Sequence, residues 1–79
     1  MDRNEVLVKL SAVFHNVFDD DSIVISDQTT ARDIDGWDSL ANIRLILSIE
    51  QEFRLKFDVG EISEFRNVGD LVTAIAGRA

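Results

Sequence analysis

Apolar residues recur with a helical period over three stretches of the chain, and each stretch predicts an amphipathic helix. In the first, residues 3–17, they fall at i, i+4, i+7, i+8 and i+11, which marks a single inward face. Asp2 can cap this helix, with Glu5 in the capping-box position three residues later. The inward face consists of Val6, Leu10, Val13, Phe14 and Val17.

The second stretch, residues 39–53, has more apolar surface than one core can cover. Asp38 and Ser39 are both good N-cap residues, and the helix they begin carries two apolar stripes. The stripes span more than half of the circumference, whereas a helix that meets one core needs a face of roughly 100°. We therefore expect one stripe to face the core and the other to face a partner. The core stripe is Leu45, Ile46, Ile49 and Phe53, and the partner stripe is Leu40, Ile43 and Leu47.

The third stretch, residues 68–76, repeats apolar residues at i, i+3, i+4 and i+7, and Asn67 is a suitable cap before it. Between the second and third stretches, residues 61–65 have room for one or two helical turns. The segment before those turns alternates apolar and polar residues. The inward-facing residues expected in this part of the chain are Phe57, Val59, Ile62 and Phe65.

No period is sustained from Asp19 to Asp38, a loop of about twenty residues that is long for a compact domain. Such a loop is compatible with a small domain if its apolar residues fold back onto the core. The candidates for this packing are Ile23, Ile25, Ala31 and Ile34.

These elements predict an all-α fold: a small antiparallel helical bundle of three longer helices and one short helix, with a long first loop. The 79 residues are expected to form a single domain, residues 1–79, near the lower end of the sizes that fold without disulfides or metals. The chain has no cysteine, which excludes a disulfide framework. Its first ten residues mix charged and apolar side chains, so we expect no signal peptide, no membrane partner and a cytoplasmic location.

Fifteen acidic residues against eight basic ones give the chain a net charge of −7. This balance argues against a nucleic-acid partner, because lysine and arginine must replace the counterions on phosphate. Partners with basic surfaces are favoured, since opposite electrostatic fields raise encounter rates. Solubility of a small domain is an equally good explanation of the charge.

The sequence contains no set of side chains at the spacing expected for a catalytic nucleophile and its base. The single histidine, His15, has no nucleophile or second ligand nearby and is interpreted as a helix-surface residue. Asp33, Asp35 and Asp38 suggest a calcium loop, but Gly36 is misplaced for an EF-hand and no glutamate follows at the required offset. The chain is therefore predicted to be neither an enzyme nor a metal-binding protein.

Ser39 allows two interpretations. As a cap it would only satisfy amides of the first helical turn, which is a common role of serine at a helix start. As an attachment point it would place a phosphodiester against free amides and the positive end of the helix dipole, both of which favour an anion. Its position alone leaves both interpretations open.

The sequence around Ser39 resembles the acyl carrier proteins. DGWDSL at residues 35–40 precedes an apolar helix that ends in EQEF at residues 50–53, and the likeness extends from the first helix to LVTAI at residues 71–75. In that family the serine of an Asp-Ser-Leu motif bears 4′-phosphopantetheine. The resemblance implies a carrier that is activated when a phosphopantetheinyl transferase moves this group from coenzyme A onto Ser39. The thiol of the group then holds acyl intermediates as thioesters.

The resemblance also implies partners beyond the transferase. These are an acyl- or aminoacyl-loading enzyme and downstream transferases or synthases of a fatty-acid, polyketide or specialised pathway, with the carrier itself expected to be a monomer. The residues expected to face such partners are Asp35, Trp37, Asp38, Leu40, Ile43, Arg44 and Leu47.

One feature departs from the fatty-acid type, in which acidic side chains one and two turns beyond the serine usually meet basic enzymes. Ala41, Asn42 and Arg44 occupy those places here, which argues against efficient exchange with a fatty-acid synthase. Two alternatives stay open. One is an aminoacyl or peptidyl carrier, although the GWDS context favours the acyl type slightly. The other is an unmodified helical module that binds a partner through the second stripe.

Overall fold

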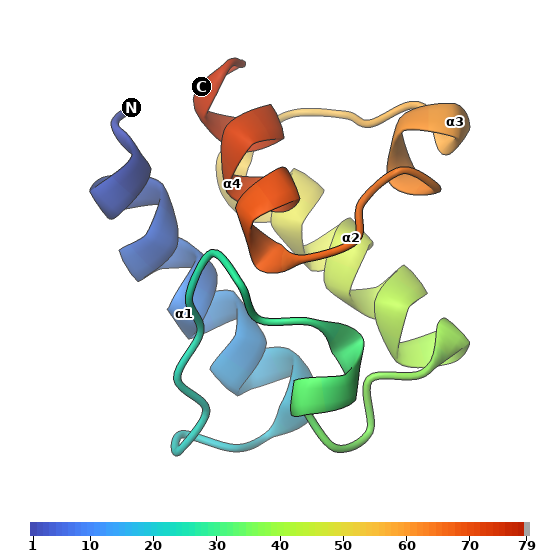
Figure 1. Cartoon of the computed structure of the whole chain (residues 1–79). Coiled ribbons are helices and arrows are strands. Elements are labelled where there is room, and N and C mark those ends of the chain that lie inside the picture. The colour runs from blue at the N-terminus through green and yellow to red at the C-terminus, as the bar shows by residue number, and fades with distance from the viewer. Residues whose placement is uncertain (79) are drawn as a thin grey trace.

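The computed structural model describes residues 1–78 and is all-helical over that range (Figure 1). The helices α1, α2 and α4 pack around one core, and the short helix α3 lies to the side, in the linker between α2 and α4. The predicted bundle of three longer helices, one short helix and a long first loop is confirmed. In chain order the elements are α1 (Arg3–Phe18), the 3-10 turn η1 (Ala31–Asp33), α2 (Ser39–Phe53), α3 (Val59–Ile62) and α4 (Val68–Ala76).

Each long helix begins at a cap that the sequence predicts. Asp2 and Glu5 form a capping box at the start of α1. Asp38 Oδ1 accepts a hydrogen bond from the Ala41 amide at 2.9 Å, and Asn67 Oδ1 accepts one from the amide three residues later, also at 2.9 Å. These bonds matter because the first amides of a helix have no acceptor within the helix itself. The cap chemistry thus sets where α1, α2 and α4 begin.

The core consists of one face of each long helix. The predicted inward stripes of α1, α2 and α4 are buried, except that Val17 is half-buried at the end of its stripe. The largest side chains that are fully buried are Phe14, Leu10, Leu45, Ile49, Ile75, Val6, Val68 and Val72.

The first loop packs on the helices through its side chains. Ile25 and Ile34 are buried in the core and Ile23 packs against it, as predicted. The expectation for Ala31 is wrong, because this residue opens the turn η1 and is exposed. The interpretation of His15 is also wrong: its ring is half-buried, and Nε2 is bonded to the carbonyl oxygen of Ile23 at 2.8 Å. The histidine therefore holds the loop against α1.

The backbone of the same loop is bonded to the start of α4. The Val68 amide donates to the Thr29 carbonyl at 2.8 Å, and the Gly69 amide donates to the Asp27 carbonyl at 2.9 Å. A Cβ on Gly69 would lie 2.8 Å from that Asp27 oxygen, so only glycine permits this approach. Arg3 adds an ion pair to the Asp27 carboxylate at 3.2 Å. These contacts hold the first loop in a fixed position against α1 and α4.

The position of α3 differs from the prediction. The helix covers Val59–Ile62 and not residues 61–65, because the side chain of Glu61 bonds back to the Asp58 amide at 3.4 Å and starts the helix there. Val59 therefore stands at the first helical position and is 85% exposed, contrary to the expectation that it faces inward.

Contacts with the core and with the C-terminal residues hold this linker in place. Phe57 is buried, and its ring meets the ring of Phe65 edge-on with 5.2 Å between centroids. Ile62 and Phe65 pack against the core, as predicted. Arg78 hydrogen-bonds the carboxylate of Glu61 and thereby lowers the pKa of Glu61 from its ordinary value. The linker is thus positioned beside α2, where it forms one side of the site described next.

Candidate functional site

A tight turn places the start of α2. The Trp37 amide donates to the Ile34 carbonyl at 3.3 Å, which closes a four-residue turn with Gly36 in its third position. Gly36 has φ of +86°, a region that glycine enters without strain and that a side chain would disfavour. The turn ends directly before the Asp38 cap, so it fixes where the first residue of α2, Ser39, lies.

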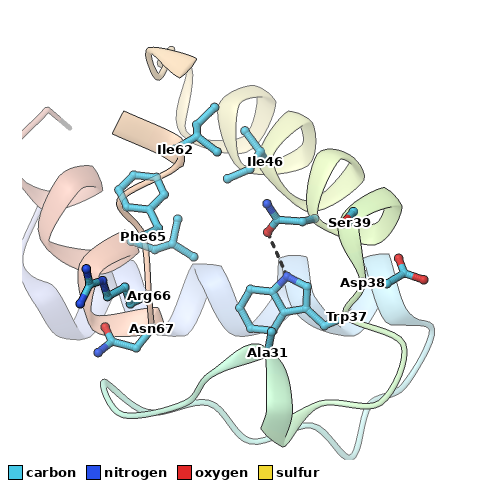
Figure 2. Close-up of a pocket in the computed structure, with 11 residues that line it drawn as sticks. Ala31, Trp37, Asp38, Ser39, Ile46, Ile62, Phe65, Arg66 and Asn67 are labelled. Carbon is cyan, nitrogen blue, oxygen red and sulfur yellow. Dashed lines mark hydrogen bonds between the residues drawn. The ribbon is translucent and has the colours of Figure 1, made fainter. Parts of the chain in front are cut away.

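Trp37 fastens this turn to the helices. Its ring meets Phe14 edge-on at 5.3 Å and lies 6.2 Å from the ring of Phe18, measured between centroids. Its Nε1 donates to Asn42 Oδ1 at 2.9 Å, the dashed line in Figure 2. The half-buried ring therefore packs within the protein, and a contact between its exposed part and a partner stays a prediction.

Ser39 is free of the capping role. Asp38 provides both capping bonds, since its Oδ1 accepts from the Ala41 amide and its carbonyl accepts from the Asn42 amide, each at 2.9 Å. The Ser39 hydroxyl is exposed and has no hydrogen-bond partner among residues 1–78. The interpretation of Ser39 as a cap is therefore wrong, and its oxygen is available for chemistry.

The backbone at this point favours an anion. The amides of Ser39 and Leu40 have no acceptor within the part of the chain that the structure describes. Unpaired amides in a first helical turn carry the positive end of the helix dipole, which stabilises phosphate groups. A phosphodiester on Ser39 would meet these two donors.

A cleft of about 380 Å³ opens beside Ser39, within the size range of small-molecule sites. It lies between α2, the loop and the linker that carries α3, and Figure 2 shows Ile46, Ile62 and Phe65 around the same space. The sequence carries no signal for this cleft, because its walls come from three segments far apart in the chain. Its polar residues beyond Asp38 and Ser39 are Asn42, Arg66 and Asn67. Its apolar wall consists of Ala31, Trp37, Ile46, Ile62, Phe65 and Leu71.

The second apolar stripe of α2 points away from the core. Leu40, Ile43 and Leu47 are 67%, 58% and 53% exposed, whereas no residue of the core stripe exceeds 8%. Asp35 and Asp38 are exposed near the beginning of this stripe. The predicted separation of the two stripes is confirmed, although a partner on the exposed one stays a prediction.

Arg44 lies beside the exposed stripe. Its side chain is exposed, and Nη2 donates to the Val17 carbonyl at 3.2 Å. That carbonyl belongs to the last turn of α1, where carbonyl oxygens have no N–H donor within their own helix. Arg44 thus joins the end of α1 to the outer side of α2 and still presents its charge to solvent.

Two other classes of site are absent from residues 1–78. No cluster of three or more histidine or acidic side chains with the geometry to hold a metal ion occurs there. None of the helices in that range has the length and apolar character needed to span a membrane.

The chain is similar to known proteins over most of its length. The family described as "Phosphopantetheine attachment site" matches residues 8–75. An acyl carrier protein of Thermotoga maritima is 27% identical over 73 residues, which cover 92% of this chain and 90% of that protein. The solution structure of holo acyl carrier protein from Geobacter metallireducens is 46% identical, with a TM-score of 0.86 over 91% of this chain and 83% of that one. The chain belongs to the phosphopantetheine-bearing proteins and, among them, to the acyl carrier protein family.

Members of this family are carriers and not catalysts, and they interact with phosphopantetheinyl transferases and biosynthetic enzymes. The cofactor is covalently attached 4′-phosphopantetheine. The residues at the start of α2 fit such a group, because they combine an unbonded hydroxyl, two unpaired amides and an adjacent cleft. The alternative of an unmodified interaction module is thereby set aside.

Proposed function

We propose that Ser39 is the residue that carries 4′-phosphopantetheine and that residues 1–79 act as a single carrier domain for acyl intermediates. The observation that supports this most strongly is the division of roles at the start of α2: Asp38 caps the helix, which leaves the Ser39 hydroxyl exposed and unbonded. When bound, the group supplies a thiol that can hold an acyl group as a thioester, which the cysteine-free chain cannot do itself.

The residues around Ser39 have distinct parts in this function. Its oxygen forms the phosphodiester, and the amides of Ser39 and Leu40 stabilise the negative charge that is added. Trp37 and Gly36 hold the turn before the helix, so the attachment point stays fixed relative to the cleft. The tether raises the local concentration of the carried group at every enzyme that docks nearby.

We further propose that enzymes dock on the exposed side of α2, because an apolar stripe beside the attachment point is left uncovered by residues 1–78. The partners are a phosphopantetheinyl transferase, an acyl- or aminoacyl-loading enzyme, and transferases or synthases of a fatty-acid, polyketide or specialised pathway. A monomeric state and a cytoplasmic location stay predictions. The proposed docking surface comprises Asp35, Asp38, Leu40, Ile43, Arg44 and Leu47.

Incubation of the apo-protein with coenzyme A and a broad-specificity phosphopantetheinyl transferase tests the attachment site. We expect the intact mass to rise by one phosphopantetheine and peptide mapping to locate it on Ser39. Ser39→Ala should stay unmodified, whereas Ser48→Ala, which changes a serine further along the same helix, should react like the wild type. Absence of the addition in the wild type, or its presence in Ser39→Ala, would contradict the proposal.

A further inference from the structure

The polar side chains of the cleft beside Ser39 present hydrogen-bond donors. Asn42 Oδ1 accepts from Trp37 Nε1 at 2.9 Å, and Asn67 Oδ1 accepts from the Asp70 amide at 2.9 Å. Neither amide nitrogen has an acceptor among residues 1–78. Since each side-chain amide has two donor hydrogens, both asparagines keep donors for a ligand that brings oxygen atoms.

Arg66 adds a positive charge to these donors. Its backbone amide donates to Asp70 Oδ2 at 2.9 Å, but its exposed guanidinium has no ion pair or hydrogen bond within the described part of the chain. In Figure 2 Asp38 and Arg66 lie at opposite edges of the cleft, and both side chains are directed outward from it. The Arg66 side chain is exposed and unpaired within residues 1–78, so it is free to turn toward a ligand in the cleft. A guanidinium is a strong and directional donor to a carboxylate.

The wall between the two edges is apolar. Ile46, Ile62 and Phe65 surround the space that separates Ser39 from Arg66 in Figure 2. A ligand that suits the whole cleft therefore has an apolar middle and an anionic end. In a chain with a net charge of −7, an unpaired cation at such a cleft makes this a favourable place for an anion.

We propose that Arg66 makes the cleft selective for acyl groups that end in a carboxylate, which are monothioesters of dicarboxylic acids, over unsubstituted acyl groups of the same length. This inference rests on the proposed attachment at Ser39, which lines the same cleft. The methylene groups of the cargo contact the apolar wall, the guanidinium of Arg66 pairs with the terminal carboxylate, and Asn42 and Asn67 donate to carbonyl oxygens. A chain that ends in a methyl group meets the same wall but leaves the arginine to water.

The test compares adipoyl and hexanoyl groups, which have equal numbers of carbon atoms and differ at the far end. Each is loaded onto the apo-protein from its coenzyme A thioester by a phosphopantetheinyl transferase. The measured quantity is the rate of thioester cleavage by hydroxylamine, divided by the rate for the same acyl group on free pantetheine. We expect the adipoyl thioester to be protected roughly three- to fivefold more than the hexanoyl thioester, as for a partly exposed ion pair, and the difference to shrink with added salt.

Variants of Arg66 test whether this residue causes the difference in protection between the two thioesters. Arg66→Gln should remove the extra protection of the adipoyl group and leave the hexanoyl rate unchanged, while Arg66→Lys should keep part of it. Arg54→Gln, which changes an exposed arginine outside the cleft, should behave like the wild type. A shift of the Arg66 Nε–H resonance on adipoyl loading, absent on hexanoyl loading, gives a second readout that needs no partner enzyme.

Two results would overturn the inference. One is equal protection of the two acyl groups in the wild type, and the other is extra protection that survives Arg66→Gln. Failure of both coenzyme A thioesters to modify Ser39 is a different result, visible as an unchanged mass before any cleavage is measured. It would overturn the attachment site itself and, with it, this inference.

Discussion

The two faces of α2 carry the same kinds of side chain in opposite surroundings. Leu45 and Ile49 are fully buried, while Ile43 and Leu47 are more than half exposed. Leucine and isoleucine occur on both faces, so composition does not distinguish them. The difference arises because α2 packs on α1 along one side only, and no helix within residues 1–78 covers the other side. A stripe of this kind next to an attachment point indicates a surface that is covered only when an enzyme docks.

Truncating one side chain on each face of α2 should give the largest difference in the free energy of unfolding. Ile49→Ala should destabilise the protein by about 2–5 kcal/mol, because it opens a cavity in the core. Leu47→Ala should change the free energy of unfolding by less than about 0.5 kcal/mol, since the side chain is already half in water. Urea unfolding of the two variants measures both values, and each kcal/mol corresponds to roughly 4–8 °C in Tm for a domain of this size.

A second pair of variants, Leu47→Ala and Leu45→Ala, separates the effect on stability from the effect on acyl exchange. Leu47→Ala should slow acyl transfer to a partner enzyme although its Tm stays near that of the wild type. Leu45→Ala is the matched leucine on the buried face and should lower Tm clearly. Equal destabilisation by Leu45→Ala and Leu47→Ala would show that the exposed stripe is covered in the folded protein.

The cap of α2 should show an intermediate effect. Asp38→Ala removes the carboxylate that accepts from the Ala41 amide, and loss of an N-cap costs about 0.5–2 kcal/mol. Asp35→Ala changes an exposed aspartate in the preceding turn that makes no capping bond, so it should be nearly neutral. Thermal unfolding of both variants tests whether Asp38, and not Ser39, starts the helix. A Tm for Asp38→Ala that matches Asp35→Ala would contradict the division of roles between Asp38 and Ser39.

The features that the sequence predicts well are those determined by short-range chemistry. The bounds of α2 and α4, the three caps and the separation of the two stripes follow from helical period and from side chains that bond amides nearby. Ser39 could be singled out but not assigned, because Asp38 and Ser39 have similar capping propensity and only the structure shows which of them bonds Ala41.

The features that the sequence misses depend on how distant segments meet. Val59 is exposed because Asp58 and Glu61 begin α3 earlier than the apolar pattern suggests. His15 is half-buried because the loop returns across α1 to bring the Ile23 carbonyl to it. The polar side of the cleft is formed only when the linker after α3 reaches α2, so Arg66 carries no signal in the sequence that would single it out.

Substitutions at Arg44 should have the smallest effect and test whether charge on the exposed face selects partners. The effect of the charge can be measured apart from the effect of the hydrogen bond to the Val17 carbonyl. Arg44→Gln and Arg44→Glu both remove the guanidinium bond, and each should cost no more than about 1 kcal/mol of stability, as for other exposed charged contacts. Only Arg44→Glu places an acid beside the stripe, where carriers of the fatty-acid type usually have one. The difference between the two variants therefore reports on charge alone.

We expect Arg44→Glu to be acylated faster than the wild type by a malonyl transferase of fatty-acid synthesis, with Arg44→Gln in between. A basic residue repels a basic enzyme surface, and like charges suppress wrong partners through the association rate. The gain should be at most roughly fivefold and should fade at high salt, because exposed charges are screened over about 10 Å at 0.1 M ionic strength. Exchange with the dedicated enzymes of this carrier should change in the opposite direction. If all three proteins react at the same rate at low salt, the charge of Arg44 does not select partners, and the apolar stripe alone determines docking on this face of α2.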